Sequence, residues 1–199
     1  RLNPAMSQLH AFVSEYSARD QPWRYLFQTT DVIMGTLLCL AGLATLVWAR
    51  HRPLGRQGWS GVGFVAGGFF SVLDALVTMD CSPTRSQACM AAEEAGHVSV
   101  NHIVHVGTST IVVVGFALPI LLLNSTMTRF RGFGLVVTWA WVVFTLLNGI
   151  GAVGWFVGTP MDYTGIWQRF SLGLGTLWWL ILAADDIVTA RVQDRARSC

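Results

Sequence analysis

The sequence predicts an all-α fold, a polytopic bundle of transmembrane helices, from its composition and its apolar segments. Of its 199 residues, 53% are hydrophobic and only 12% are charged, and the mean hydropathy is +0.50. A soluble domain normally carries about a quarter charged residues, so this chain has too few charges to cover a water-facing surface. The period-two alternation of a membrane β-barrel is absent. We therefore expect one integral membrane domain, built of helices, over residues 1–199.

Five segments are long and apolar enough to cross a bilayer, which takes about 20 mainly apolar residues. Residues 31–49 form the first, and its Trp48 suits the inner interface, where tryptophans anchor helices. Residues 58–79 form the second, in which the GxxxG spacing of Gly63 and Gly67 favours close packing of helix backbones inside the bundle. The other three segments are residues 98–123, 132–153 and 166–188.

The last two spans carry tryptophans and acidic residues that we interpret structurally. The deep tryptophans are expected to pack in the bundle rather than to hold a cofactor; they are Trp139, Trp141, Trp178 and Trp179. Asp185 and Asp186 end the fifth span and are interpreted as a solvated helix end. A transport path is disfavoured, because the first and fourth spans have no charged residue in mid-membrane.

The placement of the arginines predicts the orientation, because cytoplasmic loops carry an excess of basic residues. All thirteen basic residues are arginine, and if the spans alternate, eight fall on one side: Arg50, Arg52, Arg56, Arg129, Arg131, Arg191, Arg195 and Arg197. That side, with the C-terminal tail 189–199, is expected to be cytoplasmic at the plasma membrane. Residues 1–30, 80–97 and 154–165 then lie outside. With a net charge of only +2, membrane lipids and not nucleic acid are the expected partners.

The N-terminal side of the chain predicts one more span. Five spans that start outside require a cleaved signal peptide or an earlier helix. We expect six spans in the full protein, with the first before Arg1.

Two cysteines flank a short outer loop. Cys81 and Cys89 bracket the sequence CSPTRSQAC, and in an oxidising compartment this favours a disulfide that joins the outer ends of the second and third spans. A zinc site with Glu93, Glu94 and His97 is the alternative, although the spacing matches no standard structural zinc pattern.

Polar groups recur at one depth near the outer ends of the spans. Ionisable groups in a bilayer are costly, so they usually face the bundle interior and mark a function. The set comprises Ser71, Asp74, Asn101, His102, His105, Asn148 and Arg169. We predict a polar pocket open to the outer face, in which Asp74 pairs with Arg169 or fixes the tautomer of a histidine. The alternative is that these groups only satisfy one another and hold the bundle together.

Two chemistries are compatible with this pocket. A catalytic metal needs about three N or O ligands and an open position, and the candidate ligands are Asp74, His97, His102 and His105. Ser71 beside a histidine would instead suit nucleophilic hydrolysis. A bis-histidine haem is disfavoured, because only one span carries histidines. No cofactor is predicted, with zinc as the open possibility.

The leading hypothesis is therefore a membrane protein that binds lipid or a small molecule in an outward-facing pocket, or an accessory subunit of a larger membrane complex. The alternative is a metal-dependent intramembrane hydrolase that acts on lipid at the outer leaflet.

Several outer motifs resemble a known family. They are Asn3-Pro4, the segment FVSEYSA at 12–18, Gln21-Pro22-Trp23, and the stretch from Asp80-Cys81-Ser82-Pro83 through Cys89 to His97, His102 and His105. Together they resemble the bacterial and archaeal multi-pass family catalogued as domain of unknown function 998. The resemblance implies six spans, with Ser14, Glu15, Asp80 and the histidines on one outer surface, and brings no established activity. A fainter similarity to alkaline-ceramidase-like membrane hydrolases departs from that group's pattern, because here the histidines share one helical region.

Overall fold

The computed structural model describes residues 3–50, 55–156 and 163–198, and these residues are mainly helical with no strand. Five helices are long and apolar enough to cross a membrane, which confirms the predicted multi-pass bundle. They are α1 (Arg24–Ala49), α2 (Arg56–Leu76), α4 (Val100–Leu123), α5 (Arg131–Phe156) and α6 (Thr164–Ser198); the short elements are η1 (Ser14–Ser17), α3 (Gln87–Glu94) and η2 (Asn124–Thr126).

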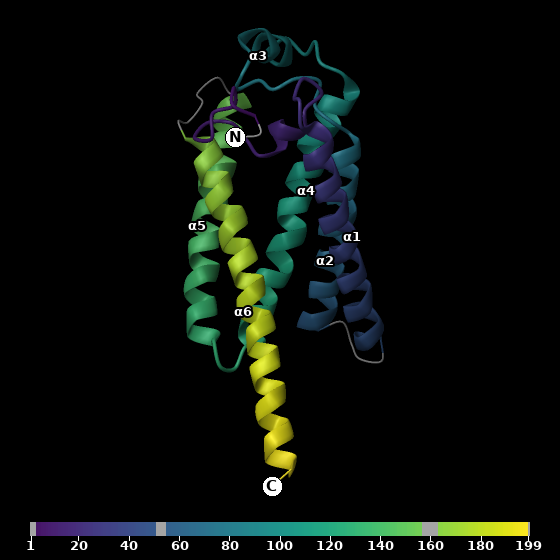
Figure 1. Cartoon of the computed structure of the whole chain (residues 1–199), viewed down its shortest axis with the longest axis vertical. Coiled ribbons are helices and arrows are strands. Elements are labelled where there is room, and N and C mark those ends of the chain that lie inside the picture. The colour runs from purple at the N-terminus through teal and green to yellow at the C-terminus, as the bar shows by residue number, and fades with distance from the viewer. Residues whose placement is uncertain (1–2, 51–54, 157–162, 199) are drawn as a thin grey trace.

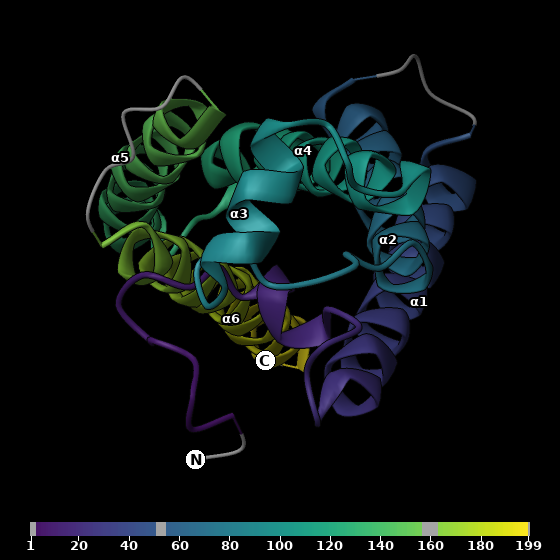
Figure 2. The same ribbon diagram turned by 90° about the horizontal axis from the view of Figure 1, so that it is seen from above.

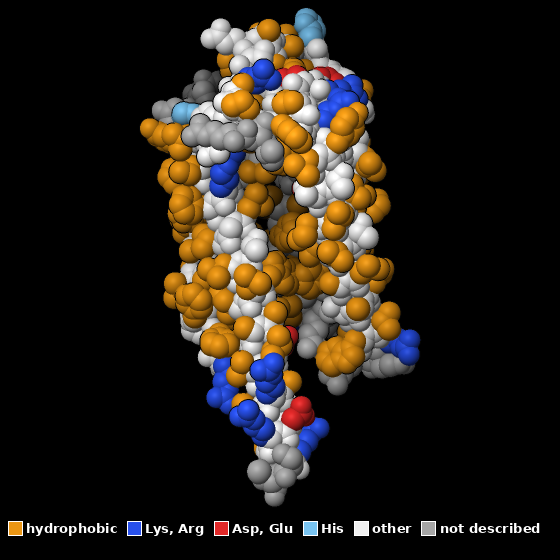
Figure 3. Space-filling model, viewed as in Figure 1, with side chains coloured by type: hydrophobic (Ala, Val, Ile, Leu, Met, Phe, Trp, Pro, Cys, Tyr) orange, Lys and Arg blue, Asp and Glu red, His pale blue; other side chains and the backbone are white. Residues whose placement is uncertain are grey.

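The long helices run side by side along the long axis of the molecule (Figure 1). α1 packs on α2, α2 packs on α4, and α5 packs on α6, so two groups of helices are joined through the η2 link. Residues 3–23 and 77–99 lie across one end of the bundle as a cap that includes α3 (Figure 2). We call this the outer end, following the orientation expected from the arginines. Arginines of the links and of the last turns of α6 gather at the opposite end, and hydrophobic side chains cover the sides between (Figure 3).

Glycines allow the close crossing of α2 and α4. A Cβ atom on Gly115 would lie 2.5 Å from the backbone N and Cα of Gly67, and one on Gly63 would lie 2.8 Å from the Gly115 carbonyl oxygen. The GxxxG pair of α2 therefore packs within the chain, as its spacing predicts.

A hydrophobic core fills the inner end between α4, α5 and α6. It contains Ile120, Met127, Val137, Trp141, Trp178 and Ile181. Trp179 packs against this core and against the Phe64 ring at 4.6 Å, whereas Trp139 is exposed. Three of the four deep tryptophans thus pack as predicted, and Trp139 faces the bundle exterior.

Asp185 corrects one prediction, because it is buried rather than solvated. Its carboxylate accepts hydrogen bonds from the backbone N–H groups of Thr128 at 2.9 Å, Arg129 at 2.6 Å and Phe130 at 2.8 Å. These donors belong to the turn before α5 and need a buried acceptor. Asp185 therefore anchors the α4–α5 link to α6, whereas its neighbour Asp186 is exposed as expected.

Candidate functional site

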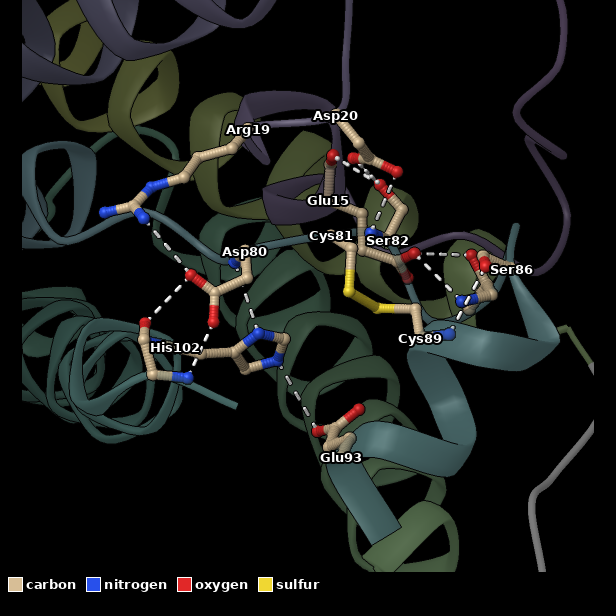
Figure 4. Close-up of a disulfide and its surroundings, with 12 residues drawn as sticks. Glu15, Arg19, Asp20, Asp80, Cys81, Ser82, Ser86, Cys89, Glu93 and His102 are labelled. Carbon is tan, nitrogen blue, oxygen red and sulfur yellow. Dashed lines mark hydrogen bonds and ion pairs between the residues drawn. A yellow bond between two sulfur atoms is a disulfide. The ribbon is translucent and has the colours of Figure 1, made fainter. Parts of the chain in front are cut away.

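The cap is held together by the disulfide between Cys81 and Cys89, as predicted, with 6.0 Å between the Cα atoms (Figure 4). It lies wholly between α2 and α4 and ties the link after α2 to the first turn of α3. Ser86 caps that turn, because its hydroxyl accepts a hydrogen bond from the Cys89 N–H at 3.3 Å. The disulfide thus fixes α3 above the helix ends.

Asp80 joins the cap to the start of α4. Its carboxylate accepts hydrogen bonds from the Ser99 N–H at 2.6 Å and the Ser99 hydroxyl at 2.8 Å, and it pairs with Arg19 Nη1 at 3.3 Å. Burial alone would raise the pKa of Asp80, but the Ser99 hydrogen bonds and the charge of Arg19 outweigh it and lower this pKa. Asp80 is therefore a structural anion at neutral pH.

Ser82 joins the two cap segments from a fully buried position. Its hydroxyl lies 3.0 Å from Asp20 Oδ1 and 3.2 Å from the Glu15 carbonyl oxygen, and it accepts a hydrogen bond from Gln21 Nε2 at 2.8 Å. Figure 4 shows Ser82, Asp20 and Glu15 beside the disulfide. The N-terminal segment is thereby fixed in place over the bundle.

Glu15 belongs to the cap, and its side chain is fully buried. Oε1 accepts a hydrogen bond from the Phe12 N–H at 3.0 Å, and Oε2 accepts from the Thr84 N–H at 3.1 Å and the Thr84 hydroxyl at 2.6 Å. Burial raises the pKa of Glu15 to about 7, and the nearby charge of Glu93 adds to this, while the hydrogen bonds act in the opposite direction. Glu15 therefore titrates near neutral pH.

Asp74 of α2 lies beside His105 of α4, with 3.3 Å between Asp74 Oδ1 and His105 Nδ1. The same nitrogen lies 3.0 Å from the carbonyl oxygens of Asp74 and Val77. Because only acceptors surround it, Nδ1 carries a proton, and in the neutral ring Nε2 is an acceptor. Asp74 also accepts hydrogen bonds from Thr108 and Ser109. Asp74 thus fixes the tautomer of a histidine, one of the two predicted roles.

The predicted pairing of Asp74 with Arg169 is wrong. Arg169 Nη1 donates to the carbonyl oxygens of Ala11 and Gly165 at 2.8 Å, and its Nη2 donates to the Tyr16 hydroxyl at 3.2 Å. The N-terminal segment folds over α6 and offers the Ala11 carbonyl and the Tyr16 hydroxyl to the guanidinium group, whereas Gly165 belongs to α6 itself. Arg169 therefore positions that segment.

His102 adopts the opposite tautomer to His105. Its Nδ1 accepts a hydrogen bond from the Asp80 N–H at 3.3 Å, so Nε2 carries the proton in the neutral ring. This nitrogen lies 3.9 Å from Glu93 Oε1 (Figure 4). The two histidines are both buried, but they contact different carboxylates.

A cavity of about 380 Å³ lies beneath the cap, between the outer halves of α4 and α5. Its polar lining consists of Ser14, Glu15, Glu93, His105, Ser109, Thr110, Thr145, Asn148 and Gln168. Its apolar lining consists of Phe12, Met79, Pro83, Val106, Val113, Val114, Ala152 and Val153, with Gly149 completing the wall. The volume lies within the range of small-molecule sites, roughly 300–1,000 Å³.

The cavity gathers only some of the predicted site residues. His105 and Asn148 line it, and Asp74 contacts it through His105 and Ser109. Ser71 instead donates to the Asp31 carbonyl oxygen at 3.5 Å, so it does not form the predicted nucleophile–histidine pair. Asn101 is half-buried on α4 outside the lining.

Several lining residues were not predicted. Glu15 and Glu93 belong to the cap, where no helical periodicity indicates which side chains turn inward. Gln168 lies next to Arg169 and accepts a hydrogen bond from the Val13 N–H at 2.5 Å. The one available signal was the resemblance to the family, which implies that Ser14 and Glu15 share a surface with the histidines.

The metal candidates do not converge in the part of the chain that the structure describes. Within residues 3–50, 55–156 and 163–198, no group of three His, Cys, Asp or Glu side chains is placed to hold a metal ion. His97 is exposed on the link before α4.

The comparison with known proteins identifies one family. The model of the family described as "Protein of unknown function (DUF998)" matches residues 1–185. No curated protein and no solved structure matches the chain.

Proposed function

Since this chain belongs to the DUF998 family, whose description assigns no activity, we propose a function from its geometry: it binds a lipid or another small amphiphile in the cavity beneath the cap. The observation that carries the proposal is that one cavity combines polar groups near its outer end with a mainly apolar lining. Carboxylates, an imidazole and an amide lie at the polar end, and valines of α4 and α5 form the wall.

The position of the cavity supports entry from the bilayer. Val114 of α4 and Val153 of α5 line the cavity and are also more than half exposed, at 57% and 62%. In a membrane-spanning helix such exposed valines face lipid tails. Where this exposed surface meets the bilayer, an alkyl chain can lie along the two valines while a polar group reaches the cap.

Gly149 offers a direct way to block the cavity. It lies in the wall, and a Cβ atom added there would meet no atom within 4 Å. Gly149→Phe therefore adds a large ring to the cavity wall with no clash at its Cβ atom. Gly107→Phe is the matched control, because Gly107 is an equally open helical glycine that does not line the cavity.

The experiment is native mass spectrometry of the protein extracted from its membrane in mild detergent. The expected result is a bound amphiphile on the wild type and on Gly107→Phe, and its loss from Gly149→Phe. Equal occupancy in all three proteins, or no bound molecule in any of them, contradicts the proposal. A retained protein partner that Gly149→Phe does not release would instead support the role of accessory subunit.

A metal-dependent hydrolase is the second candidate, and one observation favours it. His105 Nε2 and Glu93 Oε2 are buried, have no hydrogen-bond partner, and belong to residues that line the cavity. Nitrogen and oxygen donors of this kind are zinc ligands. Elemental analysis of the purified protein tests it: about one zinc per chain supports the hydrolase, and its absence contradicts it.

A further inference from the structure

Three buried polar atoms of the cavity lining have no hydrogen-bond partner among the described residues. They are Glu93 Oε2, His105 Nε2 and Asn148 Oδ1. Buried polar atoms are normally paired, so unpaired ones in a native site call for a specific explanation. His105 is 2% exposed, and α2 holds its ring through Nδ1. The unpaired atom of His105 is therefore fixed in place rather than free to rotate toward another group.

All three atoms are acceptors. Glu93 Oε2 is a carboxylate oxygen and Asn148 Oδ1 is an amide oxygen. His105 Nε2 bears the lone pair of the neutral ring, because Nδ1 carries the proton between the carbonyl oxygens of Asp74 and Val77. An organic ligand that satisfies the three atoms must supply N–H or O–H donors, because a further acceptor would leave them unpaired.

The charged side chains of the lining also favour a ligand with a cationic group. Among the residues that the structure describes, Glu15 and Glu93 are the carboxylates of the lining, and no arginine belongs to it. The nearest candidate along α6 is Arg169, but its guanidinium group bonds to carbonyl oxygens of the N-terminal segment and of its own helix. A phosphate or carboxylate group in the cavity would meet acidic side chains without a cationic partner. A cation would be stabilised.

We propose that the ligand's polar group is a primary ammonium, carried by an aliphatic chain. An R–NH₃⁺ group has three N–H donors and one positive charge, which suits a lining that contains unpaired acceptors and two carboxylates. The chain lies along the valine wall of α4 and α5. This inference rests on the proposed function and adds the chemical class of the ligand.

Matched probes separate the ammonium group from the chain. Dodecylamine, dodecyltrimethylammonium and 1-dodecanol share one alkyl chain, and only the first combines a positive charge with N–H donors. Binding of each to the purified protein in phosphatidylcholine nanodiscs is measured by displacement of a fluorescent amphiphile. We expect dodecylamine to bind at least about tenfold more tightly than either of the other two, the loss of one charged hydrogen bond being worth that factor or more.

Variants of lining residues test which side chains account for the tighter binding of dodecylamine. Glu93→Gln and Asn148→Leu should each reduce dodecylamine binding about tenfold and bring it toward that of 1-dodecanol. Glu94→Gln is the control, because Glu94 is the exposed neighbour of Glu93 on α3 and does not line the cavity. It should leave binding unchanged. A normal circular dichroism spectrum and thermal midpoint establish that each variant is folded.

The outcomes distinguish the two proposals. If the three probes bind alike and Gly149→Phe abolishes binding, the ammonium inference is overturned while the cavity remains a binding site. If Glu93→Gln leaves the preference for dodecylamine intact, the assigned acceptors are wrong. If no probe binds, or Gly149→Phe binds all of them as the wild type does, the proposed function fails as well. Competition of dodecylamine by stoichiometric zinc would assign the acceptors to a metal ion and overturn the ammonium inference.

Discussion

The fully buried Glu15 carboxyl should make the fold less stable as the pH rises from 5 to 8. Its pKa is 4.5 in the unfolded chain and about 7 in the folded one. Between these values the folded state holds a proton that the unfolded state has released, so the free energy of unfolding falls with increasing pH and levels off above about 7. At about 1.36 kcal/mol for each pH unit, the full loss is about 3 kcal/mol.

The assay is thermal unfolding in detergent at pH 5, 6, 7 and 8. A loss of about 3 kcal/mol corresponds to a midpoint lower by about 6–12 °C for a chain of this size. Glu15→Gln should remove most of this dependence, because the amide does not titrate in this range. Glu94→Gln, an exposed change on α3, should keep it. Asp80 does not interfere, since its pKa is below its ordinary value and the stability that it contributes is lost only under more acidic conditions.

A flat or rising midpoint between pH 5 and 8 in the wild type would refute this reasoning. The reasoning is also refuted if Glu15→Gln keeps the full dependence of the midpoint on pH, because another group would then be titrating.

Three further predictions concern the α2–α4 crossing, the cap disulfide and the Asp185 anchor, and each is measured by the midpoint of thermal unfolding. Gly115→Ala should destabilise the fold by about 1–3 kcal/mol, because its Cβ would meet the α2 backbone at 2.5 Å. Gly107→Ala is the control and should not destabilise it, because Gly107 has open space around it. Equal midpoints for the two variants would contradict the close crossing of α2 and α4. Reducing the cap disulfide, which closes a loop of about nine residues, should cost about 2–3 kcal/mol. An unchanged midpoint would show that the disulfide does not stabilise the fold. Asp185→Asn should cost about 1–3 kcal/mol of stability, because an amide has one acceptor oxygen for three N–H donors. The control is Asp186→Asn, a change at the exposed neighbour. Similar effects of both changes would contradict the role of Asp185 in anchoring the α4–α5 link to α6.

The spans could be predicted because a bilayer demands long apolar helices. Their ends could not, since a helix continues past the apolar region while backbone hydrogen bonds persist. α1 therefore begins at Arg24 rather than residue 31, and α6 continues to Ser198 rather than ending at 188. The tail that was expected as a separate segment is the last part of α6.

The candidate site was only partly predictable. His105 and Asn148 lie on helices, where depth in the membrane can be counted from the sequence, and both line the cavity. Arg169 was placed at the right depth but given the wrong partner, because the carbonyl oxygen of Ala11 comes from a segment far away in sequence. Glu93 was missed as a lining residue for the same reason. The direction in which the Glu93 side chain points depends on how the cap folds. That fold follows from the contacts of Asp80 and Ser82 rather than from any local sequence pattern.

The most direct test of the central claim is an experimental density map of the protein isolated from its own membrane in mild detergent. The account predicts elongated density between the outer halves of α4 and α5, with its polar end within hydrogen-bond distance of Glu93 and Asn148. A cavity collapsed by inward rotation of Val114 and Val153, or one holding only water, would contradict it.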